Sequence, residues 1–178
     1  MDIQQNYFAF LGVSEAFDID LSYVSERYRD LQKQLHPDKF AHASDREQRM
    51  AVQYTAYLNE AMATLKSPLL RAQYLLTLKG IDTHSEASVS IDPAFLFEQM
   101  ELRETLESAK ASDDPFDVLE SLSDRVEVQL RTLESAFKSA YARGDDTSLE
   151  DAAAAVRKMQ FLTKLSSEIA QAEHDLDG

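Results

Sequence analysis

The sequence predicts an all-α protein made of two helical units. Only 4 Gly and 4 Pro occur among its 178 residues, and this scarcity argues against a turn-rich β protein. Apolar residues recur every three or four positions along most of the chain, which is the spacing of one face of an α-helix. Hydrophobic residues make up 44% of the chain, enough to supply a core for one or two domains.

The acidity of the chain is unevenly distributed and indicates where the two units meet. The net charge is −14, of which residues 1–80 contribute −1 and residues 81–178 contribute −13. We therefore expect an N-terminal unit at 1–79, a linker rich in Ser, Asp and Thr at 80–91, and a C-terminal unit at 92–178. The overall acidity argues against nucleic acid or a membrane as a partner.

The chain contains no Cys, which removes disulfides, thiolate metal ligands and cysteine nucleophiles from consideration. Its N-terminus has no basic segment followed by an apolar run, so it does not resemble a secretory signal. No apolar stretch approaches the roughly 20 residues of a membrane span. We expect a cytoplasmic protein.

The first two helices of the N-terminal unit are bounded by recognisable signals. A short apolar helix at 7–11 ends at Gly12, and Asp20 can cap the next helix. Pro37 ends that second helix, because the residue before a proline avoids the α conformation. The predicted apolar face of the second helix consists of Leu21, Val24, Tyr28, Leu31 and Leu35.

Two further helices follow a loop that we expect to run from Asp38 to about Ser44. Ser44 or Asp45 starts the third helix. Pro68 suits the first turn of a fourth helix, which runs to Leu78 and stops at Gly80. The predicted apolar face of the third helix consists of Met50, Tyr54, Tyr57 or Leu58, Ala61 and Leu65.

A basic helix face leads directly into the tripeptide His36-Pro37-Asp38. At about 100° per residue, Arg29, Lys33 and His36 fall on one solvent-facing side of the second helix. This pattern predicts an exposed, stiffened loop with one imidazole and one carboxylate beside cationic side chains. No Ser or Cys nucleophile accompanies them, and two ligands are too few for a metal site. On spacing alone, a helix stop with an incidental histidine is the alternative.

The N-terminal unit resembles a J domain. The shared residues occur in order over about seventy positions and comprise Tyr7, Leu11-Gly12-Val13, the basic helix, His36-Pro37-Asp38-Lys39-Phe40, Leu58-Asn59-Glu60-Ala61, Leu65, Pro68, Arg71-Ala72 and Tyr74. J domains dock on a DnaK-type chaperone and stimulate its ATP hydrolysis. The resemblance implies that His36, Pro37 and Asp38 form the stimulating loop. It also implies that Arg27, Arg29 and Lys33 meet an acidic face of the chaperone, although Arg27 lies beside the apolar face.

Three long helices are predicted in the C-terminal unit. Asp-Pro pairs at 92–93 and 114–115 each place a capping residue before a proline at the first helical position. The first helix has roughly twenty residues, and the second runs from about Phe116 to Arg143. A capping box at 147–150 opens the third, which ends near Asp175. Long helices joined by short turns predict an antiparallel three-helix bundle.

The first helix of this bundle has too many apolar residues for one face. One apolar stripe consists of Phe95, Leu102, Leu106 and Ala109. A second, roughly 160° away on a helical wheel, consists of Leu96, Phe97 and Met100. The first stripe can face the bundle, whereas the second is bordered by Glu101 and Glu104, which is typical of an interface. The alternatives are that the second stripe packs on the N-terminal unit and that Phe161 is a core aromatic.

Nearly the whole chain resembles the HscB family of J-type co-chaperones of iron–sulfur cluster assembly. Residues 94–106 and 156–165 are similar to the first and last helices of the family's C-terminal domain, and 68–76 is closer to HscB than to general J proteins. In that family the bundle binds the cluster scaffold IscU through an apolar patch with acidic neighbours. The implied patch consists of Leu96, Phe97, Met100, Glu101, Glu104 and Phe161. Phe97 departs in type, since some members are expected to have Met there.

The resemblance implies an adaptor that performs no bond chemistry. The bundle would hold the scaffold, while the J domain would present it to an HscA-type, DnaK-class ATPase chaperone and trigger ATP hydrolysis. We expect these two proteins as partners, and neither a metal nor a cofactor in this chain.

Other functions compete with this interpretation. A J-domain adaptor for a different client has the same support from the N-terminal unit. A general DnaJ is less favoured, because no Gly/Phe-rich or Cys-rich segment is present. A metal phosphohydrolase could use His36 and Asp38, but it would need further ligands, and the other histidines are scattered through the chain.

Overall fold

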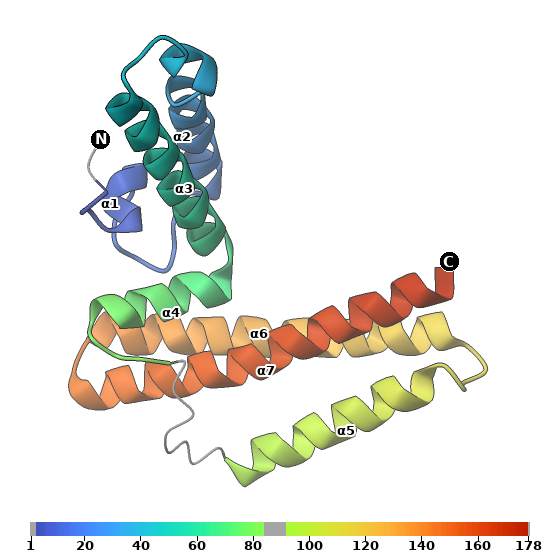
Figure 1. Ribbon diagram of the computed structural model, residues 1–178. Helices are drawn as coiled ribbons and strands as arrows, with labels where there is room; N and C mark the ends of the chain where they lie inside the picture. Colours follow the sequence, from blue (N-terminus) through green and yellow to red (C-terminus); the bar gives the residue numbers. More distant parts are fainter. Residues whose placement is uncertain (1–2, 84–91, 178) are drawn as a thin grey trace. The chain divides into compact units, whose positions relative to one another are not determined.

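The computed structural model describes residues 3–83 and 92–177, and this part of the chain is helical without strands (Figure 1). It divides into two compact units, Met1–Lys79 and Gly80–Gly178. Residues 84–91, which make up most of the predicted linker, lie outside the described residues.

The N-terminal unit is built on a pair of helices that lie side by side, α2 (Leu21–Gln34) and α3 (Asp45–Lys66) (Figure 1). A short 3₁₀ turn, η1 (Pro37–Phe40), lies in the connection between them, where the sequence predicts only a loop. Helix α1 (Tyr7–Leu11) packs on α3, and α4 (Pro68–Leu78) follows α3 directly.

The predicted ends of these helices are confirmed, because their signals are local. The Asp20 side chain accepts hydrogen bonds from the first backbone N–H groups of α2. Gly12 ends α1 with φ of 75°, a left-handed conformation that glycine adopts without the steric cost of a side chain. Ser44 and Glu47 form a reciprocal capping box at the start of α3.

Two residues of the predicted apolar faces are exposed instead. Leu21 is 41% exposed because it is the first residue of α2, and the buried face begins one turn later at Val24. Met50 is 40% exposed, whereas its neighbour Ala51 is buried. The buried face of α3 therefore begins one residue later than predicted.

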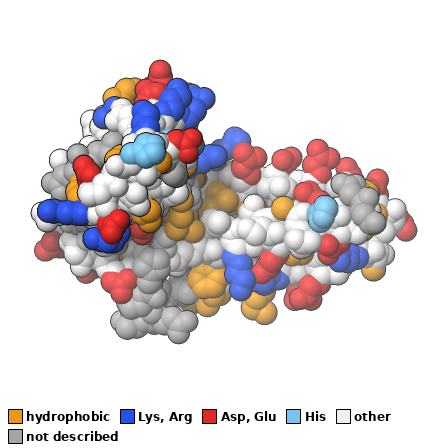
Figure 2. All heavy atoms as spheres, turned by 45° about the horizontal axis from the view of Figure 1, so that its top comes forward, with side chains coloured by type: hydrophobic (Ala, Val, Ile, Leu, Met, Phe, Trp, Pro, Cys, Tyr) orange, Lys and Arg blue, Asp and Glu red, His pale blue; other side chains and the backbone are white. Residues whose placement is uncertain are grey.

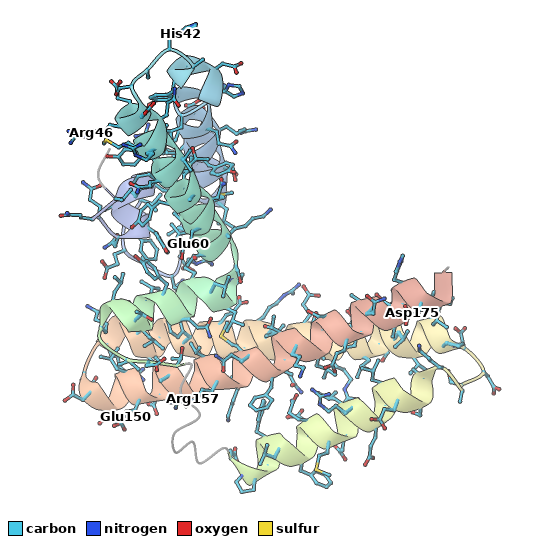
Figure 3. The ribbon with its side chains drawn as sticks, in the orientation of Figure 1. His42, Arg46, Glu60, Glu150, Arg157 and Asp175 are labelled. Atoms are coloured by element: carbon cyan, nitrogen blue, oxygen red, sulfur yellow. The ribbon has the colours of Figure 1, made fainter. Side chains whose placement is uncertain are left out.

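Aromatic rings fasten α1 to α3 and α4. The rings of Tyr7 and Tyr74 stack with centroids 4.4 Å apart, and Tyr57 meets Tyr7 edge-on at 5.1 Å. The backbone N–H of Tyr7 donates to the Tyr74 hydroxyl at 3.1 Å. Burial, followed by a hydrogen bond with Glu60 on α3 (Figure 3), raises the pKa of Tyr7 well above its usual range. The tyrosines therefore hold three helices together, and Tyr7 remains protonated at neutral pH.

The C-terminal unit is a three-helix bundle of α5 (Pro93–Ala109), α6 (Pro115–Arg143) and α7 (Asp146–Asp177). Successive helices reverse direction, so the bundle is antiparallel (Figure 1). The three helices share one core cluster, which consists of Phe95, Leu102, Ala109, Leu119, Leu122, Val126, Leu162, Leu165, Ile169 and Ala172.

The capping signals of this unit are confirmed at two helices and wrong at the third. Asp92 and Asp114 cap α5 and α6. Helix α7, however, begins at Asp146 rather than at the capping box predicted for 147–150. The carboxylate of Asp145 accepts hydrogen bonds from the backbone N–H of Ser148 at 3.0 Å and from its hydroxyl at 2.7 Å. Asp is a stronger N-cap residue than Thr. The helix therefore starts two residues earlier than it would with Thr147 as the cap.

Candidate functional sites

The first candidate site is the loop His36–Asp38, between α2 and α3. His36 caps η1, and its Nδ1 accepts a hydrogen bond from the backbone N–H of Asp38 at 3.3 Å. The backbone N–H of Lys39 donates to the carbonyl of His36 at 3.0 Å. The side chains of His36 and Asp38 are nevertheless 61% and 91% exposed. The loop therefore holds its backbone in a tight turn while presenting an imidazole and a carboxylate to solvent.

A groove of about 1120 Å³ opens beside this loop, between α2 and α3. Of the six predicted chaperone-binding residues, four line it: Arg29, Lys33, His36 and Asp38. Arg27 is exposed on α2 but is not among the lining residues, and the side chain of Pro37 lies outside the description. Figure 2, which brings this end of the unit forward, shows Lys, Arg, His and acidic side chains gathered on it.

The apolar floor of the groove is a feature that the sequence reasoning missed. It consists of Leu35, Phe40, Ala51, Val52 and Ala56. Val52 is 70% exposed, and a β-branched residue that falls outside the predicted apolar face of α3 is the signal that could have identified it. At the far end of the groove, the Tyr28 hydroxyl on α2 donates to Asn59 Oδ1 on α3 at 2.9 Å. This hydrogen bond holds the two walls of the groove together.

The cationic wall of the groove is available to an acidic partner. Lys33 forms an ion pair with Asp30 at 3.7 Å, but both side chains are more than half exposed. Such surface pairs contribute little and are easily exchanged for another partner. His42 and Arg46 lie at the same end of the unit (Figure 3).

The second candidate site is the outer face of α5. Its three apolar residues are exposed: Leu96 by 42%, Phe97 by 63% and Met100 by 60%. Glu101 and Glu104 are exposed on the same helix. The buried stripe predicted for α5 is confirmed, because Phe95, Leu102 and Ala109 belong to the bundle core and Leu106 packs against it.

Phe161 lies on α7 against the start of α5. It is 39% exposed, and its ring meets the buried ring of Phe95 edge-on with centroids 6.2 Å apart. One aromatic pair therefore links the core to the surface. We call Leu96, Phe97, Met100 and Phe161 the apolar patch.

Polar contacts fix α5 on α7 around the patch. Lys158 Nζ lies 3.8 Å from Asp92 Oδ2 and 5.2 Å above the ring centroid of Phe95. Arg103 donates to Glu168 Oε2 at 3.0 Å. At the other end, Lys110 donates to Asp175, which is labelled near the end of α7 in Figure 3, at 3.4 Å. A hydrogen bond from Gln171 is the main cause that lowers the pKa of Asp175. Because these ion pairs are largely exposed, they add little to the burial of Phe95, Leu102 and Ala109, which holds the backbone that carries the patch.

The described residues contain no group of three or more His, Cys, Asp or Glu side chains placed to hold a metal ion. A phosphohydrolase centred on His36 and Asp38 would need such a group. No helix within the described ranges is long and apolar enough to cross a bilayer. The two surfaces offer docking chemistry: an apolar groove with cations and a solvent-facing carboxylate, and an apolar patch with carboxylates beside it.

Comparison with known proteins covers both units. Residues 91–170 match the family model described as the HSCB C-terminal oligomerisation domain. The chain is 40% identical over 171 residues to the co-chaperone protein HscB homolog of Shewanella halifaxensis. This alignment covers 96% of this chain and 98% of the relative.

Solved structures show the same similarity. The chaperone HscB from Vibrio cholerae matches with a TM-score of 0.85 and 41% identity, covering 97% of this chain and 99% of that chain. The human co-chaperone protein HscB matches with a TM-score of 0.86 and 26% identity, covering 97% and 84%.

These similarities confirm the predicted fold, an N-terminal J domain followed by a C-terminal helical bundle. They also show that the protein is a co-chaperone and not an enzyme. Since relatives with about 40% identity match it over almost their whole length, this protein belongs to the HscB family of co-chaperones.

Proposed function

We propose that this protein binds an IscU-type iron–sulfur scaffold and delivers it to an HscA-type, DnaK-class chaperone in the cytoplasm, whose ATPase it stimulates. The outcome is assisted transfer of the cluster and maturation of the recipient protein. The observation that carries the proposal is the exposed apolar patch on α5 and α7, in a chain whose other unit presents the His36–Asp38 loop.

The chaperone is engaged by charge and by a rigid loop. Arg29 and Lys33, with Arg27 beside them on α2, face an acidic surface of the chaperone. Such charges accelerate encounter and orient the complex more than they raise affinity. The carboxylate of Asp38, which is 91% exposed, then accepts a charge-assisted hydrogen bond from a cationic group of the chaperone.

The scaffold is held by burial of the apolar patch. Leu96, Phe97 and Met100 leave water when a complementary surface covers them, and Phe161 extends the contact onto α7. A few apolar anchors at the centre of an interface commonly contribute most of its binding energy. Glu101 and Glu104 border the patch and favour a partner with basic residues at the rim. The aromatic ring of Phe97 keeps the patch apolar.

The contribution of the whole chain is proximity. A scaffold bound to the bundle meets the chaperone as part of one molecule, so its encounter with the substrate-binding site is nearly intramolecular. ATP hydrolysis, triggered through the loop, tightens the grip of the chaperone on the scaffold. The resulting strain on the scaffold assists release of the cluster.

The decisive measurement is the ATPase rate of an HscA-type chaperone with this protein, with the scaffold, and with both. We expect synergy between the two. His36→Gln should abolish stimulation while calorimetry shows unchanged scaffold binding. Combined replacement of Leu96, Met100 and Phe161 by Ala should remove the synergy but keep the stimulation by the co-chaperone alone.

Two outcomes would contradict the proposal. Equal loss of scaffold binding and stimulation in the His36 variant would show that the two sites are not separate. Stimulation of the chaperone without any binding of the scaffold would indicate that the protein is instead an adaptor for a different client.

A further inference from the structure

One side chain of α3 holds the connection that follows the His36–Asp38 loop. Gln48 Nε2 donates to the carbonyl oxygens of Phe40 and Ala43, both at 3.2 Å. A side-chain amide has two N–H groups, so both hydrogen bonds can form together. Phe40 is the last residue of η1, and Ala43 precedes the cap of α3. Gln48 therefore ties both ends of the segment 40–43 to the helix.

Short-range turn bonds also hold the backbone of residues 36–43. Lys39 N–H donates to the His36 carbonyl at 3.0 Å, Ala41 N–H to the Asp38 carbonyl at 3.5 Å, and Ala43 N–H to the Phe40 carbonyl at 3.0 Å. Each of these bonds joins two residues of the segment 36–43, so none of them fixes the orientation of that segment against a helix. The Gln48 amide supplies such a link.

The helix end that carries Gln48 is itself fixed. Glu47 accepts hydrogen bonds from the backbone N–H and the hydroxyl of Ser44, at 2.9 and 2.7 Å. These bonds lower the pKa of the Glu47 carboxyl, so the capping box is ionised and intact at neutral pH. Gln48 also lines the groove together with His36 and Asp38. Its amide thus connects a rigid helix start to the loop on the side where the partner would dock.

We propose that Gln48 is a positioning residue for the His36–Asp38 loop, acting through the backbone of residues 40–43. The inference rests on the proposed role of the loop in stimulating the chaperone. Without the amide, the free loop would sample more orientations, and only a fraction would be competent to bind. The apparent affinity falls in proportion to that fraction, whereas the complex, once formed, holds the loop in place.

The test uses the full-length protein with two variants that remove the donor. Gln48→Met keeps the length of the side chain, and Gln48→Glu keeps its shape but presents a carboxylate to the two carbonyls. Gln53→Met, an exposed glutamine of the same helix that does not line the groove, is the matched control. Amide hydrogen exchange of Ala41 and Ala43 is measured in the free protein, and chaperone ATPase is measured against co-chaperone concentration.

We expect faster exchange of these amides in both Gln48 variants and wild-type exchange in the control. The concentration for half-maximal stimulation should rise roughly three- to tenfold, which corresponds to a competent fraction of roughly a third to a tenth. The maximal stimulation should stay at the wild-type level. This separates Gln48 from His36, whose replacement should lower the maximum.

Unchanged amide exchange in both Gln48 variants would overturn the inference whatever the ATPase shows. It would mean that Gln48 does not hold the free loop, so that any loss of stimulation comes from direct contact with the chaperone. An unchanged half-maximal concentration in both variants would equally overturn it. If the wild-type protein itself failed to stimulate the chaperone, the proposed function would fall. The exchange comparison, which needs no chaperone, would still decide whether Gln48 holds the loop.

Discussion

Leu102 and Met100 lie two residues apart on α5. Truncating each to alanine distinguishes a residue of the bundle core from a residue of the apolar patch. Leu102 is fully buried in the core cluster, whereas Met100 is 60% exposed. Leu102→Ala should therefore change stability, and Met100→Ala should change scaffold binding. The two variants lie on the same helix and serve as controls for each other.

The expected magnitudes follow from burial. Truncation of a completely buried leucine costs about 2–5 kcal/mol of the free energy of unfolding. Complete burial of a methionine contributes about 1.5–3 kcal/mol, so the two-fifths of Met100 already out of water contributes about 1 kcal/mol at most. If the scaffold covers the remaining three-fifths, binding loses about 1–2 kcal/mol in the Met100 variant, or about 5- to 30-fold in Kd.

Urea unfolding followed by circular dichroism gives the stability difference, and calorimetric titration with an IscU-type scaffold gives the affinity. The binding measurement on Leu102→Ala is made where the variant is still folded, and its affinity should equal that of the wild type. A Met100 variant that loses as much stability as the Leu102 variant, with unchanged scaffold affinity, would refute the assignment of Met100 to a binding surface.

Three further predictions concern charge, backbone and pH. Replacing Arg29 and Lys33 by Ala should weaken chaperone stimulation at low salt and remove most of its salt dependence; wild-type stimulation that does not vary with salt would contradict electrostatic docking. Gly144→Ala should cost about 1–2 kcal/mol in urea unfolding, because Gly144 has φ of 72° and an alanine there adopts a left-handed conformation; the nearest atom to the added Cβ, at 3.8 Å, would not clash. Hydrogen bonds from Ser148 lower the pKa of Asp145 below its ordinary value of 3.8, so the stability that Asp145 contributes is complete above that pH and is lost as the pH falls through the lower folded value. The difference in melting temperature between the wild type and Asp145→Ala should therefore shrink in acid, and a difference that grows would contradict the assignment.

Much of the candidate chaperone site could be predicted from the sequence. The order of the motif residues placed His36 and Asp38 in an exposed loop after a basic helix, and the structure shows this arrangement. The apolar floor of the groove could not be predicted in the same way. Val52 and Phe40 meet there only because α2 and α3 pack with η1 between them, and Gln48 reaches the loop for the same reason.

The sequence by itself determined the class of fold and the limits of most helices, because caps, prolines and glycines act within one turn of the backbone. It also identified two apolar stripes on α5. The glutamates beside the second stripe already indicated that the first stripe enters the bundle core, and the structure confirms this. Only the tertiary structure decided that Phe161 meets the core ring of Phe95, because that contact requires α5 and α7 to lie together. The structure also shows that Asp145 rather than Thr147 caps α7, because the Asp145 carboxylate accepts the backbone N–H of Ser148; this choice is local and follows the N-cap preference for Asp over Thr.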